Sequence, residues 1–354
     1  MSDNSILTRE RNLIDFLKGI AIFLVLYGHT IQYCCQSSFD FFDNYVFKII
    51  YSFHMPFFML ISGYLFYFSF QKREIKDLVI HKTQSLLQPI IFGTILTSLL
   101  KAILHRDFSG FLHNDWIGNF GGFWFLWSVL ACSLTLSLIY KTTDRFWLHI
   151  ILLFFGIFFV YLFPNKTLTI YMFPYFLIGF LYSKYKDRLN NLYKIFSYIS
   201  LPLFPILLIF YNKEHYIYTS GLHFSLPLSS DIVFVDLYRW LIGFVGSIFT
   251  ITVIKYAFNY LYEKTLLSKL RLYICYLGKK SLQIYVLQSF FLEYCLNWGY
   301  EKIVKYLGYN ILYKNTLLYN FLYTPLIAIT YSIILALIII VLEKTKINKI
   351  IFGR

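Results

Sequence analysis

Charged residues are scarce in this sequence. They make up 14% of the chain, whereas soluble domains carry about a quarter. Acidic residues are the scarcest, with 18 Asp and Glu against 32 Lys and Arg. Hydrophobic residues reach 58% and aromatic residues 22%, which is more apolar surface than a soluble core could hide. The composition therefore excludes an ordinary globular domain and predicts a polytopic membrane protein.

Metal-binding patterns, repeats and cleavage sites are also missing. The cysteines are Cys34, Cys35, Cys132, Cys275 and Cys295. They show no metal-ligand spacing, so we expect structural roles for them and no metal site. No A-x-A-like site follows the first apolar run, which favours an uncleaved first span over a signal peptide. Without internal repeats or low-complexity linkers, residues 1–354 are predicted to form a single membrane domain.

Long apolar runs recur along the chain, and about ten of them can cross a ~30 Å hydrocarbon layer as helices. The predicted spans are 13–34, 45–69, 85–104, 121–140, 146–163, 168–183, 194–211, 233–257, 274–297 and 317–342. Polar and apolar residues do not alternate as they do in barrel strands. The expected fold is an all-α membrane helix bundle of about ten transmembrane helices.

Basic residues gather in the short loops on one side of these spans. The formal net charge is +14, and the positive-inside rule places both termini in the cytoplasm. Topology thus explains the basic excess, and we expect no nucleic-acid partner. The longest polar connection, residues 212–232, is predicted to lie outside, where long connections are often functional.

The first predicted span carries charged residues where lipid disfavours them. Asp15, Lys18 and His29 lie in "LIDFLKGIAIFLVLYGHT" (13–30), and Arg11 precedes it. At about 100° per residue the four share one stripe of a helix, with His29 about 16 Å above Lys18. Such a stripe favours a protein-lined cavity over lipid. The alternatives are snorkelling of Lys18, a local ion pair of Asp15, and a hydrogen-bonded core histidine.

A second histidine opens the next span. His54 lies in "YSFHMPFFMLISGYLF", and both histidines fall in the outer half of adjacent antiparallel helices, so a contact between them is geometrically possible. Pro56 and Gly63 are expected to loosen the second helix, as discontinuous membrane helices do near ligands. The alternative is a kinked packing helix.

These motifs together resemble the acyltransferase 3 family of bacterial integral membrane proteins, many of which O-acetylate surface polysaccharides. The resemblance covers nearly the whole chain. It rests on Lys18 followed after ten residues by His29, on "FHMPFFMLISGYLF", on the "WFL" element at Trp124, on "FPYFLIGFLYSKY" and on "LGKKSLQIYVLQS", in this order. Two departures concern contacts with the donor or substrate: Ser85 replaces a second basic residue beside Lys82, and Gln288 replaces a common histidine.

The resemblance implies transfer of an acetyl or other short acyl group from acyl-CoA to a hydroxyl of a cell-surface glycan or its lipid-linked precursor. It implies a multi-pass protein of the bacterial cytoplasmic (inner) membrane, with acetyl-CoA as a donor substrate and no permanently bound cofactor. A hydroxyl that attacks a thioester needs a base, and a neutral imidazole suits this near pH 7. His29 is the predicted general base or transient acyl carrier.

The remaining predicted site residues divide between donor and acceptor. Basic side chains suit the phosphates of coenzyme A, and the candidates are Arg11, Lys18, Arg73 and Lys82, although positive-inside placement also explains the loop residues. His54 and the Ser62–Gly63 turn are the candidate oxyanion donors. Predicted acceptor-binding residues are Asp15, Ser62, Trp124 and Arg239. For Arg239, a structural ion pair with Asp236 is the alternative.

A transporter or flippase of a glycan-related substrate is the alternative function, because a charged stripe can also carry protons or substrate. Paired repeats, which are common in transporters, are missing. A membrane glycosyltransferase would need more carboxylates than the few found inside the spans, such as Asp15 and Glu293.

Overall fold

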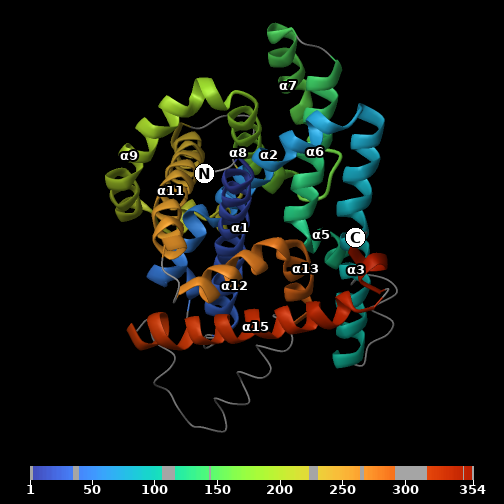
Figure 1. The fold of residues 1–354 in the computed structure, drawn as a ribbon, viewed down its shortest axis with the longest axis vertical. Coiled ribbons are helices and arrows are strands. Elements are labelled where there is room, and N and C mark those ends of the chain that lie inside the picture. The colour runs from blue at the N-terminus through green and yellow to red at the C-terminus, as the bar shows by residue number, and fades with distance from the viewer. Residues whose placement is uncertain are drawn as a thin grey trace. The chain divides into compact units, whose positions relative to one another are not determined.

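The computed structural model describes residues 3–34, 40–105, 116–142, 145–222, 230–263, 267–291, 317–345 and 347–352. Every regular element in these ranges is helical (Figure 1), which confirms the all-α prediction. The long helices are α1 (Asp3–Tyr33), α2 (Tyr45–Lys72), α3 (Ile75–His105), α6 (Trp124–Thr142), α8 (Lys166–Lys184), α9 (Lys186–Phe210), α11 (Ser230–Glu263) and α15 (Thr324–Glu343). Shorter helices are α5 (Trp116–Gly122), α7 (Phe146–Val160), α10 (Ile217–Ser220), α12 (Ser268–Lys279), α13 (Ser281–Phe291) and α16 (Ile347–Phe352).

The chain forms two compact units. Unit 1 comprises Met1–Phe58, Ile195–Tyr216 and Leu241–Lys344, and unit 2 comprises Met59–Lys194, Ile217–Trp240 and Thr345–Arg354. Three of the five boundaries between them fall inside α2, α9 and α11, and the other two fall directly before α10 and after α15.

Seven of the described helices are long and apolar enough to cross a membrane: Thr8–Tyr33, Tyr45–Lys72, Ile75–Ile103, Trp124–Thr142, Lys186–Phe210, Val233–Tyr262 and Tyr319–Glu343. Each coincides with a predicted span. The predicted span 146–163 corresponds to α7, a helix of 15 residues. The predicted span 168–183 corresponds to α8, a helix of 19 residues that is not among the seven.

The described part of the predicted span 274–297 is not one continuous helix. The chain forms α12 and α13 there, and they meet at Lys280. The physical reason is the pair Lys279 and Lys280, whose charged side chains interrupt the apolar run and are costly inside a membrane. Residues 292–297 lie outside the described ranges.

Glycines allow helices to approach closely within each unit. In unit 1, α12 lies against α1 (Figure 1). A Cβ added to Gly19 would overlap the carbonyl oxygen of Ile274, and one added to Gly278 would overlap the carbonyl oxygen of Asp15. In unit 2, Gly63 of α2 has the same relation to the carbonyl of Phe176 in α8. Small residues bring membrane helices together in this way.

Candidate functional site

The polar stripe of α1 lies toward the interior of unit 1. Arg11 is exposed at its beginning, and Asp15, Lys18 and His29 are partly buried. Two further positions of the same stripe are fully enclosed, since Ile22 is 0% and Val25 is 2% exposed. Because these side chains are sheltered by protein, the stripe does not face lipid. Between Lys18 and His29, however, the stripe consists of the aliphatic side chains Ile22 and Val25, so it is not polar along its whole length.

Helix α12 covers the beginning of this stripe. The thiol of Cys275 donates a hydrogen bond to the carbonyl oxygen of Asn12, with an S···O distance of 3.4 Å. Burial raises the pKa of this thiol above its usual value, and the carboxylate of Asp15 raises it further. Sequence reasoning missed this cover because it assigned Cys275 to a membrane span. The pattern of α12, with exposed Lys269 and Lys279 and buried Cys275 and Leu277, offers a weak signal of an amphipathic surface helix.

His29 is the residue of the stripe that is predicted to act as the base or acyl carrier. Among the described residues, neither ring nitrogen of His29 has a hydrogen-bond partner. Its ring packs edge-on against Tyr33, with centroids 5.9 Å apart. An imidazole held by a ring contact, with its nitrogens uncommitted, is available to a substrate hydroxyl or to an acyl group.

His54 is enclosed and its tautomer is set by the backbone. The side chain is 2% exposed, and its Nδ1 lies 2.9 Å from the carbonyl oxygen of Ile50. A carbonyl only accepts, so Nδ1 carries the proton and Nε2 of the neutral ring carries a lone pair. The ring of Tyr51 lies 4.6 Å from the ring of His54 and also faces Gly28 of α1, the residue before His29. The structure therefore places His29 and His54 in the same part of unit 1, with Tyr51 in contact with both segments.

This tautomer changes the role available to His54. Neutral His54 accepts a hydrogen bond through Nε2, whereas an oxyanion donor must offer an N–H. The predicted Ser62–Gly63 turn is also corrected, because both residues lie inside the continuous helix α2, which includes Pro56. The backbone N–H groups at Ser62 and Gly63 belong to this helix, so the expected break near the site does not occur.

Two of the predicted donor residues lie in unit 2. Arg73 is partly buried in the connection between α2 and α3. The Lys82 ammonium lies over the ring of Phe66, 5.3 Å from its centroid, an arrangement that favours the cation through the ring quadrupole. Arg11 and Lys18 belong to unit 1.

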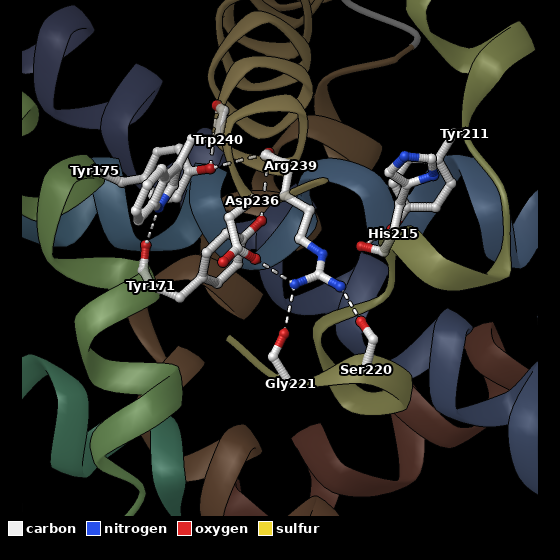
Figure 2. A network of polar contacts seen from close by, with 9 residues as sticks. All are labelled: Tyr171, Tyr175, Tyr211, His215, Ser220, Gly221, Asp236, Arg239 and Trp240. Carbon is white, nitrogen blue, oxygen red and sulfur yellow. Dashed lines mark hydrogen bonds and ion pairs between the residues drawn. The ribbon is translucent and has the colours of Figure 1, made fainter. Parts of the chain in front are cut away.

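Trp124 and Arg239 meet at one short element of unit 2. Trp124 begins α6 and packs edge-on against Tyr218 of α10, with centroids 6.2 Å apart. Arg239 of α11 holds the end of the same helix, since its guanidinium donates to the carbonyl oxygen of Gly221 at 2.5 Å and to the hydroxyl of Ser220 (Figure 2). Two residues predicted to bind the acceptor are thus joined through α10.

The guanidinium of Arg239 is enclosed in its own network. It forms an ion pair with Asp236 at 2.6 Å, and both side chains are 1% exposed. The hydroxyl of Tyr175 donates to the carbonyl oxygen of Arg239 at 3.3 Å (Figure 2). Gly221 has φ +73°, a left-handed conformation that suits glycine. The expected alternative for Arg239, a structural ion pair with Asp236, is therefore present, and Arg239 positions the end of α10.

Among the described residues, no group of three or more His, Cys, Asp or Glu side chains is arranged so that it could hold a metal ion. Cys34, Cys132 and Cys275 are buried, and none of them forms a disulfide with a described residue. Cys35, Cys295 and Glu293 lie outside the described residues.

Comparison with known proteins gives one family and two relatives. The chain is 30% identical over 227 residues to the nodulation protein NolL of Mesorhizobium japonicum, a match that covers 60% of each chain. It is 38% identical over 128 residues to the nodulation protein NolL of Sinorhizobium fredii, covering 35% of each chain. The chain thus spans less than two thirds of either relative. No solved structure matches it.

The family match is far more extensive than either of these. A model described as an acyltransferase domain aligns with residues 11–342, which begins at Arg11 and includes both histidines, the α12 cover and the α10 network. The chain therefore belongs to the acyltransferase 3 family.

Proposed function

We propose that this protein is a membrane O-acyltransferase that moves an acetyl or other short acyl group from acyl-CoA to a hydroxyl of a cell-surface glycan or its lipid-linked precursor. We further propose that it works in the bacterial cytoplasmic membrane. One observation carries the chemical part: His29 stands on the sheltered stripe of α1 beside His54, with no hydrogen-bond partner among the described residues. The family membership supports the type of reaction.

The proposed reaction uses His29 as its proton acceptor. The acceptor hydroxyl attacks the thioester carbonyl carbon while His29 takes the hydroxyl proton. The carbon–sulfur bond then breaks, and the imidazolium returns the proton to the departing thiolate. In the alternative route a ring nitrogen of His29 attacks the thioester carbonyl carbon and the carbon–sulfur bond breaks to release the thiolate. The acceptor hydroxyl then takes the acyl group from His29, and its proton passes to the thiolate. Both routes need an uncommitted ring nitrogen at this position.

His54 is proposed as a positioning residue for His29. Its Nδ1 is bound to the carbonyl of Ile50, so its Nε2 lone pair can accept an N–H from a neighbouring ring or from a substrate. Such a bond would fix the tautomer of His29 and stabilise the imidazolium that forms when His29 takes a proton.

The donor is proposed to approach the beginning of the polar stripe in unit 1, where Arg11 and Lys18 would attract the phosphates of the coenzyme. In unit 2, Arg73 and Lys82 are proposed as further donor contacts. Trp124 of the same unit would offer an aromatic face to a sugar ring, and Arg239 acts by holding α10, because its own donors are occupied. Asp15 of unit 1 and Ser62 of unit 2 remain candidate acceptor contacts.

The test of this function is the replacement His29→Ala, with His81→Ala of the exposed face of α3 as a matched control. We expect the His29 variant to lose about 10²- to 10⁴-fold in acyl transfer, measured by mass spectrometry of glycan after supply of isotope-labelled acetyl-CoA. Normal transfer by a His29 variant present at normal levels would overturn the proposal. Glycan movement across vesicles without labelled product would favour the transporter.

A further inference from the structure

Two arginines of unit 1 share one tyrosine ring. The guanidinium carbon of Arg9 lies 5.0 Å and that of Arg271 lies 4.3 Å from the ring centroid of Tyr262. The three residues come from α1, α11 and α12, so tertiary packing alone brings them together. Tyr262 is 39% exposed, and the cluster is open at its surface.

The cluster lies at one end of two apolar helices. Arg9 precedes the apolar part of α1, and Tyr262 lies next to the last residue of α11. Arg9 joins the two ends by donating a hydrogen bond to the Oδ1 atom of Asn259 at 3.0 Å. One or two turns further into the helices, Phe16 packs edge-on against Phe258, with centroids 5.4 Å apart. The cluster is therefore attached to the same membrane edge from which the polar stripe of α1 starts.

The charge of the two arginines is not neutralised within the described part of the chain, because neither forms an ion pair with a carboxylate there. The exposed Glu10 follows Arg9 in sequence. Structural arginines usually pair with carboxylates, as Arg239 does with Asp236. The stacking on Tyr262 orients the planes of Arg9 and Arg271 but leaves most of their N–H groups for another partner.

Helix α12 fixes the position of Arg271. Two residues of this helix touch α1 directly, Cys275 through its bond to Asn12 and Gly278 through its contact with the backbone of Asp15. Arg271 lies one turn before Cys275 on the same helix. A side chain held on a clamped helix is preorganised, which lowers the entropy cost of binding.

We propose that Arg9, Tyr262 and Arg271 form a binding site for the phosphate groups of the nucleotide part of the acyl donor. Guanidinium groups match phosphate with parallel N–H···O bonds, and both arginine planes and a tyrosine ring can stack on a base. The site lies where the stripe toward His29 begins, so a bound nucleotide would leave its flexible thioester arm to extend along α1. This inference rests on the proposed function, since that function supplies the donor.

An anionic lipid headgroup presents the same phosphate chemistry at a membrane edge. The experiment must therefore separate a soluble coenzyme from a lipid. Acetyl-CoA and acetyl-pantetheine share the reactive thioester but differ in the nucleotide and all its phosphates, and vesicles of zwitterionic lipid remove the anionic headgroup.

The test compares the wild type, the Arg9→Gln/Arg271→Gln double variant and Lys269→Gln, which removes an exposed charge from the same helix. All are reconstituted in zwitterionic vesicles. We expect the double variant to raise the KM for acetyl-CoA about 10- to 100-fold with little change in kcat, since each lost phosphate contact is worth up to about tenfold. With acetyl-pantetheine the three proteins should have equal KM, and Lys269→Gln should match the wild type throughout.

An unchanged KM for acetyl-CoA, or an equal rise for both donors, would overturn the assignment. A third result would also overturn the assignment. If anionic vesicles stabilise the wild type but not the double variant, and the KM for acetyl-CoA is the same in both, the arginines bind lipid instead of the coenzyme. Direct binding of radiolabelled CoA separates this inference from the proposed function. If CoA binds to the wild type but not to the double variant, the site is supported even if no acyl transfer is found. If CoA does not bind to the wild type, the site is refuted.

Discussion

Arginine occurs in two contrasting settings in this protein. Arg239 of unit 2 is 1% exposed and spends its donors on Asp236, Ser220 and Gly221. Arg9 and Arg271 of unit 1 stack on one half-open tyrosine ring and pair with no described carboxylate. The same type of side chain therefore maintains the fold in one unit, and in the other it is proposed to bind phosphate.

The comparison indicates that the charge of an arginine does not by itself show its role. What matters is whether the guanidinium is buried together with protein groups that accept its hydrogen bonds. A buried guanidinium must have its N–H groups satisfied by the protein, since an unpaired buried charge is very costly. A guanidinium at a membrane edge keeps its hydration and can exchange water for a ligand. Arg239 was a reasonable binding candidate from sequence, and its neighbours in the fold make it a positioning residue.

The largest effect is expected from breaking the buried pair. Arg239→Met should cost about 3–5 kcal/mol because it leaves Asp236 buried without a partner. Thermal unfolding in detergent measures this loss. The Asp236→Leu/Arg239→Met double variant should recover part of the stability, because replacement of both charges by apolar groups is often tolerated. If Arg239→Met melts like the wild type, the structural role of this arginine is wrong.

A smaller effect is expected from displacing α12. Gly278→Ala would place a methyl group on the carbonyl of Asp15, so α12 must shift and carry Arg271 away from Tyr262. The expected result is a rise of about tenfold in KM for acetyl-CoA, as one phosphate contact is weakened. Steady-state kinetics measure it, with Gly118→Ala as control, since an added Cβ there meets nothing within 4 Å. Equal kinetics in the two variants would contradict the close packing of α12.

Salt provides a gentler way to separate the two kinds of arginine. Exposed charges are screened at physiological ionic strength, and buried pairs much less. Raising salt from 0.05 to about 0.5 M should raise the KM of the wild type for acetyl-CoA and affect the Arg9→Gln/Arg271→Gln variant less. The melting temperature, which depends on the Arg239 pair, should change little. A salt dependence that is identical in both proteins would count against the arginine cluster.

The smallest effect is expected at an exposed ion pair. The Lys213 ammonium bonds the carboxylate of Asp40, and this bond, aided by a backbone bond from Phe42, lowers the pKa of Asp40 below its usual value. The contribution to stability is then present above about pH 4 and is lost as the pH falls through the lowered pKa. Asp40→Asn should therefore shift the melting temperature at pH 7 by no more than a degree or two, and a larger shift would show that the pair is not merely superficial.

Local features of this chain were predictable because they follow from periodicity. The all-α fold, seven of the spans and the placement of Asp15, Lys18 and His29 on one flank need only the 3.6-residue repeat and the composition. The boundary of the ninth predicted span was not predictable in this way. An apolar run of this kind has the same periodicity whether it forms one long helix or two shorter ones. Here the chain divides into two helices at Lys279 and Lys280.

The sequence by itself determined the membrane class, the family and the polar flank of α1, because each depends on residues near one another along the chain. Tertiary structure alone decided which side chains meet: α12 over the start of that flank, His54 bound to Ile50 beside His29, Arg239 enclosed with α10, and Arg9 with Arg271 on Tyr262. Such partners lie as much as about 260 residues apart, and only packing of helices against one another selects them from the many polar groups of the chain.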